Sequence, residues 1–179
     1  MCNINAVSNT FRQHSKTSPH HEAHLAWLGE RSKLWNIVMT WHVPNAMRRH
    51  YGGYDALWLG KELTRYFNKV DRRIYKAGLK NRGMRLPRII TLECDENVGW
   101  HAHGILDYAP GRNEDETIQI LSKLWLSHTS RFATDKFEKH LVIGQYDNGY
   151  GLPYIIKRID RQNEKVKGIL DLNNTYLPD

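Results

Sequence analysis

The sequence predicts an α+β fold, with strands and helices in the order β-α-β-β-α-β-α. The first observation behind this prediction is a hairpin signal at residues 88–106, where two strand-like runs flank the turn residues 95–99. The second is helical periodicity in residues 55–77 and 114–128, where apolar residues recur at steps of three and four. A chain of 179 residues is one domain's worth and can bury an ordinary core.

Composition favours a polyanionic partner without requiring one. Lysine and arginine number 26 against 19 acidic residues, a formal net charge of +7. Such a balance suits nucleic acid, although many basic proteins bind none. Cys2 and Cys94 are too few for a disulfide framework, and no apolar run reaches signal-peptide or membrane-spanning character. We therefore expect a soluble, cytoplasmic protein with no membrane association.

The N-terminal third divides into a polar arm, a helix and a strand. Residues 1–17 show no pattern, whereas Ser18-Pro19 resembles an N-cap with proline at the first helical position, so residues 1–34 are expected to form an arm and a helix. Residues 35–43 read as the first strand, ended by Pro44. Alternation assigns Ile37, Met39 and Trp41 to one face and Val38, Thr40 and His42 to the other, where His42 could face the same groove as any metal ligands.

A long helix capped by Asp55 follows and carries cations on its outer face. Its apolar stripe comprises Leu59, Leu63, Tyr66, Phe67, Val70 and Ile74. Charge on a helix face is usually only a solvated surface, but here further arginines follow the helix. The region could therefore track a phosphate backbone, and our candidates for DNA contact are Arg65, Arg72, Arg73, Arg85 and Arg88.

The hairpin contains the strongest chemical signal in the chain. Antiparallel pairing of Arg88–Cys94 with Trp100–Leu106 would set Glu93 beside His101, with His103 on the same face. A His-x-His pair alone is often just two polar residues on a wet sheet face. A carboxylate on the neighbouring strand favours a metal site over two incidental polar residues, because metal sites are built from such clusters. The mixed nitrogen and oxygen set favours a catalytic divalent ion over a closed structural site.

The predicted elements after residue 106 end in a short helix that carries a second group of candidate functional residues. Asn113 is expected to cap the helix over residues 114–128, residues 139–145 read as a strand, and a short helix opens near Pro153. On that last helix Tyr154 shares one side with three cations, and isoleucines occupy the other side. An interfacial tyrosine on an ordinary amphipathic helix is the plain alternative. The three cations are Lys157, Arg158 and Arg161, of which the two arginines join our candidates for DNA contact.

The pattern E-x7-H-x-H, followed about fifty residues later by Y-x-x-K, resembles the HUH endonucleases, most closely the rolling-circle replication initiators called Rep proteins. The resemblance covers roughly residues 35–161 and implies an endonuclease domain over residues 35–179. It implies a central antiparallel sheet of the RNA-recognition-motif or ferredoxin-like type, with helices packed on it. It also implies Glu93, His101 and His103 as ligands of Mn²⁺ or Mg²⁺, with Tyr154 and Lys157 as catalytic residues.

The activity that the resemblance implies is sequence-specific nicking of single-stranded DNA at a replication origin. Tyrosine attack would leave a 5′-phosphotyrosine and a free 3′-hydroxyl, which can later rejoin the strand. The expected partner is single-stranded DNA or an origin hairpin of a plasmid or virus, with a helicase supplied in trans. Two features depart from the family pattern: Ala102 is small for the middle position of the motif, and Tyr150 precedes Tyr154 by four residues but is separated from it by Gly151 and Pro153.

Three alternatives remain at this point. A transposase or a relaxase of the same HUH chemistry would share the metal and the tyrosine. A cupin-like metalloenzyme would use His101 and His103 with Asp107, four residues after the second histidine. A nucleic-acid-binding module without catalysis would carry the histidines incidentally.

Overall fold

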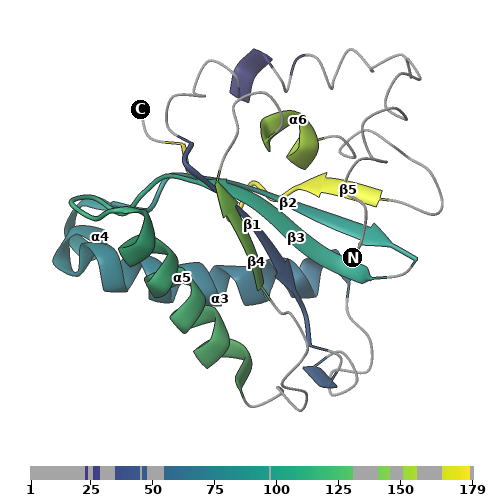
Figure 1. Cartoon of the computed structure of the whole chain (residues 1–179), viewed down its shortest axis with the longest axis horizontal. Helices are drawn as coiled ribbons and strands as arrows, with labels where there is room; N and C mark the ends of the chain where they lie inside the picture. The colour runs from purple at the N-terminus through teal and green to yellow at the C-terminus, as the bar shows by residue number, and fades with distance from the viewer. Residues whose placement is uncertain are drawn as a thin grey trace, which may run out of the picture.

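The computed structural model describes Ala23 and residues 26–28, 35–44, 46–47, 55–96, 98–130, 141–145, 151–156 and 167–177. Its centre is a five-stranded sheet in the order β4-β1-β3-β2-β5, with every neighbouring pair antiparallel (Figure 1). The strands are β1 Ile37–His42, β2 Arg88–Asp95, β3 Gly99–Leu106, β4 Leu141–Gln145 and β5 Lys167–Leu170. The helices are α3 Ala56–Tyr75, α4 Ala77–Arg82, α5 Glu114–Thr129 and α6 Gly151–Ile156.

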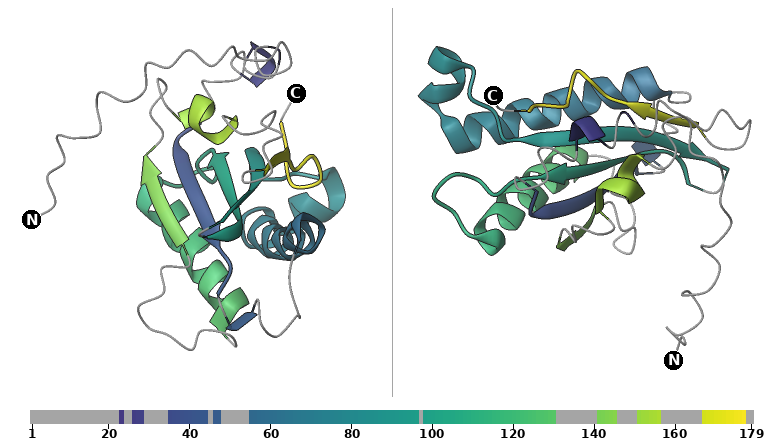
Figure 2. Two further views of the ribbon diagram at one scale, coloured as in Figure 1. Left: turned by 90° about the vertical axis from the view of Figure 1, so that its right-hand side faces the viewer. Right: turned by 90° about the horizontal axis from the view of Figure 1, so that it is seen from above.

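Helices cover the two faces of this sheet unequally. The long helices α3 and α5 lie on one face and the short α6 lies on the other, as Figures 1 and 2 show from three directions. The α3/α5 face contains the larger core, in which Trp41 and Ile90 of the sheet pack with Phe67 of α3 and Trp125 of α5. The α6 face contains a smaller cluster of buried residues, comprising Leu28, Trp35, Ile89, Ile105, Leu152 and Ile155. The sheet therefore separates a surface on the α6 side from one on the α3/α5 side.

Local sequence signals explain where the two long helices begin. The side chain of Asp55 accepts a hydrogen bond of 2.7 Å from the backbone N–H of Trp58, which caps α3. The side chain of Asn113 accepts one of 2.9 Å from the N–H of Glu116, and the Glu116 carboxylate accepts one of 3.2 Å from the N–H of Asn113. This reciprocal pair is a capping box and satisfies two donors at the start of α5.

The structure confirms the α+β class, the hairpin and both long helices. It adds two elements that the pattern did not predict, α4 and β5. β5 is only four residues long, and its pairing with β2 joins segments more than seventy residues apart, so a local pattern carries little trace of it. Of the predicted N-terminal helix, Ala23 and residues 26–28 are helical, and its other residues lie outside the described part.

Arg88 does not lie on the protein surface, so its predicted contact with DNA is wrong. Its side chain is 3% exposed and pairs with the fully buried carboxylate of Asp71, with Nη1–Oδ1 and Nη2–Oδ2 distances of 3.0 Å and 3.1 Å. The Nε–H also donates to the carbonyl oxygen of Asn174 at 2.9 Å, and the guanidinium lies 4.2 Å from the centre of the Phe67 ring. A fork–fork pair of this kind fixes β2 to α3.

Candidate metal centre

Three potential metal ligands converge on the α6 face of the two central strands. Glu93 of β2 pairs directly with His101 of β3, and His103 follows two residues later on the same face. All three residues are buried, with exposed fractions of 1%, 4% and 4%. One ligand atom from each lies within 4.8 Å of the others, and no other such group of three occurs among the described residues. This group could therefore bind a divalent metal ion.

The distances between the ligand atoms suit a shared ion. Glu93 Oε2 lies 3.4 Å from His103 Nε2 and 3.8 Å from His101 Nε2. Both values exceed the usual N–H···O length of about 2.7–3.2 Å. Two atoms that both bind one ion at about 2.0–2.1 Å can lie no more than about 4.2 Å apart. Both Glu93 distances lie within this limit, so the residues fit a metal ion.

Hydrogen bonds on the far side of each ring hold the histidines in place. His101 Nδ1 lies 2.9 Å from the carbonyl oxygen of Gly99, which can only accept, so Nδ1 carries the proton. The lone pair of neutral His101 is therefore on Nε2, which faces Glu93. His103 Nδ1 lies 2.8 Å from the hydroxyl of Thr40, its partner across the β1–β3 ladder. Such contacts orient metal-binding histidines and fix their tautomers.

The electrostatic surroundings keep His101 available as a ligand. Burial lowers the pKa of His101 below its ordinary value, and the neighbouring His103 lowers it further. The hydrogen bond with Gly99 and the charge of Glu93 oppose this shift without reversing it. A neutral imidazole is the form that binds metal. His42 stacks beside His101, with ring centres 5.8 Å apart, so it faces this group as the strand alternation suggested.

Tyr154 lies beside the same group. Its ring centre is 5.4 Å from that of His103, with the planes at 83°, and 47% of the residue is exposed to solvent. The helix that carries it, α6, is fixed to the sheet by the buried side chains of Leu152 and Ile155. The hydroxyl of Thr91 donates to the carbonyl oxygen of Ile155 at 3.2 Å. A phenol that solvent can reach is thus held next to the ligand cluster.

The other predicted site residues are distributed away from this cluster. Arg65, Arg72 and Arg73 lie exposed on α3, which covers the opposite face of the sheet. Arg85 is partly exposed and approaches Asp71 at 3.4 Å and Asn68 at 3.3 Å. None of these four shares a face with Tyr154. Three candidates lie outside the described residues: Lys157, Arg158 and Arg161. The nearby Tyr146 and Tyr150 also lie outside them.

The residues that support the ligands had no role assigned from the sequence. Thr40 already fell on the face of His42 in the strand alternation, which was the available signal. The carbonyl of Gly99 and the hydroxyl of Thr91 carry no signal in the sequence, because their roles depend on the hairpin turn and on the docking of α6. Gly99 has a φ of 70°, a conformation that favours glycine.

The cupin-like alternative is contradicted by the fold. A cupin is nearly all β, whereas here two long helices cover one face of a five-stranded sheet. Asp107, its proposed third ligand, instead accepts a hydrogen bond of 2.7 Å from Asn36 and another of 2.7 Å from the N–H of Tyr108. It is not among the three clustered ligands.

The chain has a distant structural likeness to a viral nuclease domain. No protein-family model and no curated protein matches it. Among solved structures, it is similar to the N-terminal nuclease domain of non-structural protein 1 of minute virus of mice, described as having Zn²⁺ coordination in its active-site pocket and a mode of DNA recognition at the replication origin. The identity is 10%, the TM-score is 0.37, and the match covers 86% of this chain and 79% of that one. A likeness of this degree does not place the chain in a family.

Proposed function

We propose that this chain is a metal-dependent endonuclease that nicks single-stranded DNA and becomes covalently joined to it through Tyr154. The observation that carries the proposal is the contact between Tyr154 and His103, whose ring centres are 5.4 Å apart. Because His103 is also one of three clustered ligands, a phosphate bound at the ion would lie close to the phenol. Proximity of nucleophile and electrophile is a principal source of rate acceleration.

Each residue of the group has a defined task in this reaction. Glu93, His101 and His103 would hold the ion, and the carboxylate and phosphate oxygens favour Mn²⁺ or Mg²⁺. The ion, when bound, supplies Lewis-acid polarisation of a non-bridging oxygen of the scissile phosphate. The Tyr154 oxygen attacks phosphorus as its proton leaves to solvent. The bond from phosphorus to the 3′-oxygen breaks, and that oxygen takes a proton to become a free 3′-hydroxyl.

The cations after Tyr154 complete the proposed site. Lys157 follows one helical turn after the tyrosine in the sequence pattern, and a charge there would stabilise the tyrosinate, whose phenol has a pKa near 10 in water. Arg158 and Arg161 would contact the phosphates of the bound strand. These three assignments rest on the sequence pattern, since residues 157–161 lie outside the described part of the chain.

The biological setting that fits this chemistry is initiation of rolling-circle replication of a plasmid or virus, in the cytoplasm of the host. Residues 35–179 would form the endonuclease domain, preceded by the arm and helix of residues 1–34. The substrate would be single-stranded DNA or an origin hairpin, and a helicase would act in trans. A transposase or relaxase would make and break the same bonds, so the bond chemistry alone does not distinguish them. Among the described residues no helix is both long and apolar enough for a membrane span.

The test is a cleavage assay with single-stranded oligonucleotides labelled at either end. With Mn²⁺ or Mg²⁺ present, we expect the fragment on the 3′ side of the nick to migrate with the protein on a denaturing gel, and the other fragment to be free. EDTA should abolish both products, and added metal should restore them. Cleavage that persists in EDTA, or fragments that never join the protein, would reject the proposed chemistry.

A further inference from the structure

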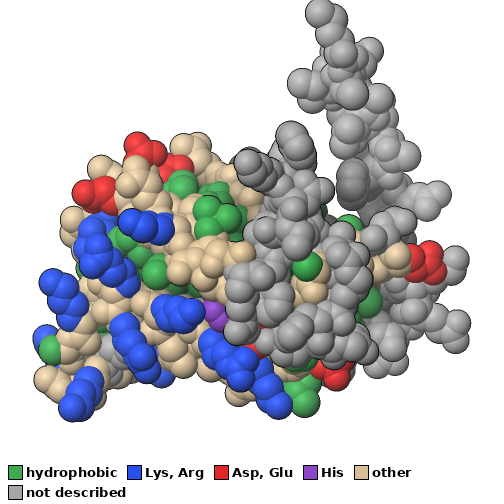
Figure 3. All heavy atoms as spheres, turned by 90° about the horizontal axis from the view of Figure 1, so that it is seen from below, with side chains coloured by type: hydrophobic (Ala, Val, Ile, Leu, Met, Phe, Trp, Pro, Cys, Tyr) green, Lys and Arg blue, Asp and Glu red, His purple; other side chains and the backbone are tan. Residues whose placement is uncertain are grey.

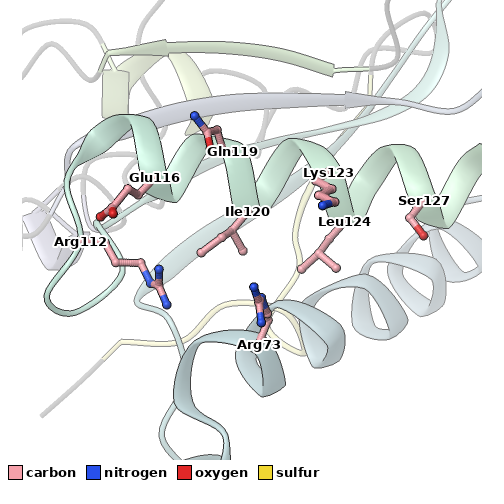
Figure 4. Close-up of a pocket in the computed structure, with 8 residues that line it drawn as sticks. All are labelled: Arg73, Arg112, Glu116, Gln119, Ile120, Lys123, Leu124 and Ser127. Carbon is pink, nitrogen blue, oxygen red and sulfur yellow. The ribbon is translucent and has the colours of Figure 1, made fainter.

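The α3/α5 face of the molecule contains two adjoining hollows. One has a volume of about 480 Å³, and the other about 580 Å³, and Ser127 of α5 lines both. They follow the groove between α3 and α5, which is closed beneath by packing that includes a hydrogen bond of 3.0 Å from the Tyr66 hydroxyl to the carbonyl oxygen of Leu121. Figure 4 shows Arg112 and Arg73 extending into the first hollow from the loop before α5 and from α3.

Positive charge dominates the lining of this groove. Arg73, Arg112 and Lys123 line the first hollow, and Arg65, Lys69 and Arg72 line the second. Against these six cations stand two carboxylates, a formal excess of four charges where the whole chain has +7. Lysine and arginine side chains spread across the described part of this face in Figure 3.

Both carboxylates in the groove are already engaged. Glu62 pairs with Arg65 and accepts a hydrogen bond of 3.0 Å from His128, while Glu116 belongs to the cap of α5. Four cations, in contrast, have side chains that make no ion pair with any described residue: Arg72, Arg73, Arg112 and Lys123. These four are therefore available to an anionic partner.

We infer that this groove binds the phosphate backbone of duplex DNA, at a surface separate from the cleavage site. The separation follows from the sheet, whose α6 face carries the ligand cluster while α3 and α5 cover the opposite face. A strand seated at Tyr154 cannot occupy the groove at the same nucleotides. A second DNA segment would therefore bind here, in addition to the strand of the proposed function, and its binding would not depend on the tyrosine chemistry.

The composition of the lining favours a duplex over a single strand. Surfaces that bind single strands combine cations with aromatic side chains on which the bases stack. Among the described residues, no tryptophan, tyrosine or phenylalanine lines either hollow. The four cations of α3 in the groove, from residue 65 to residue 73, span about 12 Å of helix axis. A duplex offers about seven phosphate charges over that length.

The test uses the full chain in EDTA, so that cleavage does not interfere, with a fluorescent blunt-ended duplex of about 20 base pairs. In the groove variant, Arg73, Arg112 and Lys123 are all changed to glutamine. In the matched control, which loses the same charge outside the groove, Lys61→Gln, Lys80→Gln and Arg82→Gln are combined. Fluorescence anisotropy over a salt series gives the slope of log K against log salt, and thermal melting verifies that both variants fold.

Each lost phosphate contact should make the slope of log K against log salt less steep by about 0.9. The slope of the groove variant should therefore be about 2.7 less steep than that of the wild type. The slope of the control should change by less than about 0.9. Equal losses in the two variants would overturn the inference, since binding would then reflect net charge alone. Loss of single-stranded binding with unchanged duplex binding would also overturn it. Both variants should still form the tyrosine adduct with single-stranded DNA, so failure of the groove and failure of the cleavage chemistry give different results.

Discussion

Changing Gly104 to alanine tests how tightly the sheet that carries the ligands is packed. Gly104 follows His103 in β3, and its open side faces the core under α3. A Cβ there would lie 2.7 Å from Ile90 Cδ1 and 2.7 Å and 2.8 Å from Trp41 Cζ3 and Cη2. Carbon atoms in contact are normally about 3.5–4.0 Å apart, so the neighbours must move by nearly 1 Å.

The two neighbours differ in how easily they can move. The Ile90 methyl ends a flexible side chain, whereas the Trp41 ring is fully buried and packs edge-on against Tyr66 and Phe67, with ring centres 6.2 Å and 5.6 Å away. Overpacking of this kind costs about 1–3 kcal/mol, and we expect the upper part of that range because the indole cannot retreat. For a chain of this length each kcal/mol lowers Tm by about 2–4 °C, which gives a decrease of about 4–12 °C.

Circular dichroism melts measure this decrease, and Gly144→Ala is the matched control. Gly144 also lies in a strand, β4, but an added Cβ would meet nothing within 4 Å, so its effect should stay within about 0.5 kcal/mol. A Gly104→Ala protein that melts within a degree of the wild type would show that the core under β3 is looser than described. Equal destabilisation by both changes would refute the packing argument as well.

Three further predictions concern the ion pair and the ligand cluster. Arg88→Met should lower the free energy of unfolding by about 3–5 kcal/mol in urea titrations, because the buried Asp71 loses its guanidinium partner. If stability were unchanged and binding of single-stranded DNA weaker, Arg88 would instead be a surface residue that contacts DNA. Thr40→Val should weaken Mn²⁺ binding by about 10–100-fold in calorimetric titrations, since His103 loses the contact that orients it, and undiminished affinity would remove that role. His101→Ala should abolish cleavage while binding of single-stranded DNA persists, because backbone cations supply most of that affinity; a variant that still cleaves would exclude His101 as a ligand.

The parts of the structure that alternation governs could be predicted from the sequence. Pairing about the turn at residues 95–99 sets Glu93 opposite His101, and the period of two then brings His103 to the same face. The apolar stripe of α3 likewise specified which side of the helix is buried. In each case the information lies within a few residues of chain.

Contacts between distant segments could not be predicted in this way. Arg88 is buried because it pairs with Asp71, seventeen residues earlier. A charge pattern in the sequence does not distinguish a buried ion pair from a solvated arginine. The position of Asp71 one turn after Phe67, within the apolar stripe, was the available signal. Nor does any pattern reveal that Arg72 and Arg73 lie on the opposite face of the sheet from Tyr154, because this depends on how α3 packs.

Covalent attachment of DNA to Tyr154 can be tested with an adduct assay on three single variants. Tyr154→Phe keeps the ring that packs near His103 and removes only the attacking oxygen, so folding and DNA binding should persist. Tyr146→Phe and Tyr150→Phe are the matched controls, with the same change in neighbouring tyrosines. On denaturing gels with Mn²⁺ and single-stranded DNA, we expect no adduct from Tyr154→Phe and a normal adduct from the other two. An adduct that survives Tyr154→Phe would show that Tyr154 does not form the bond with DNA.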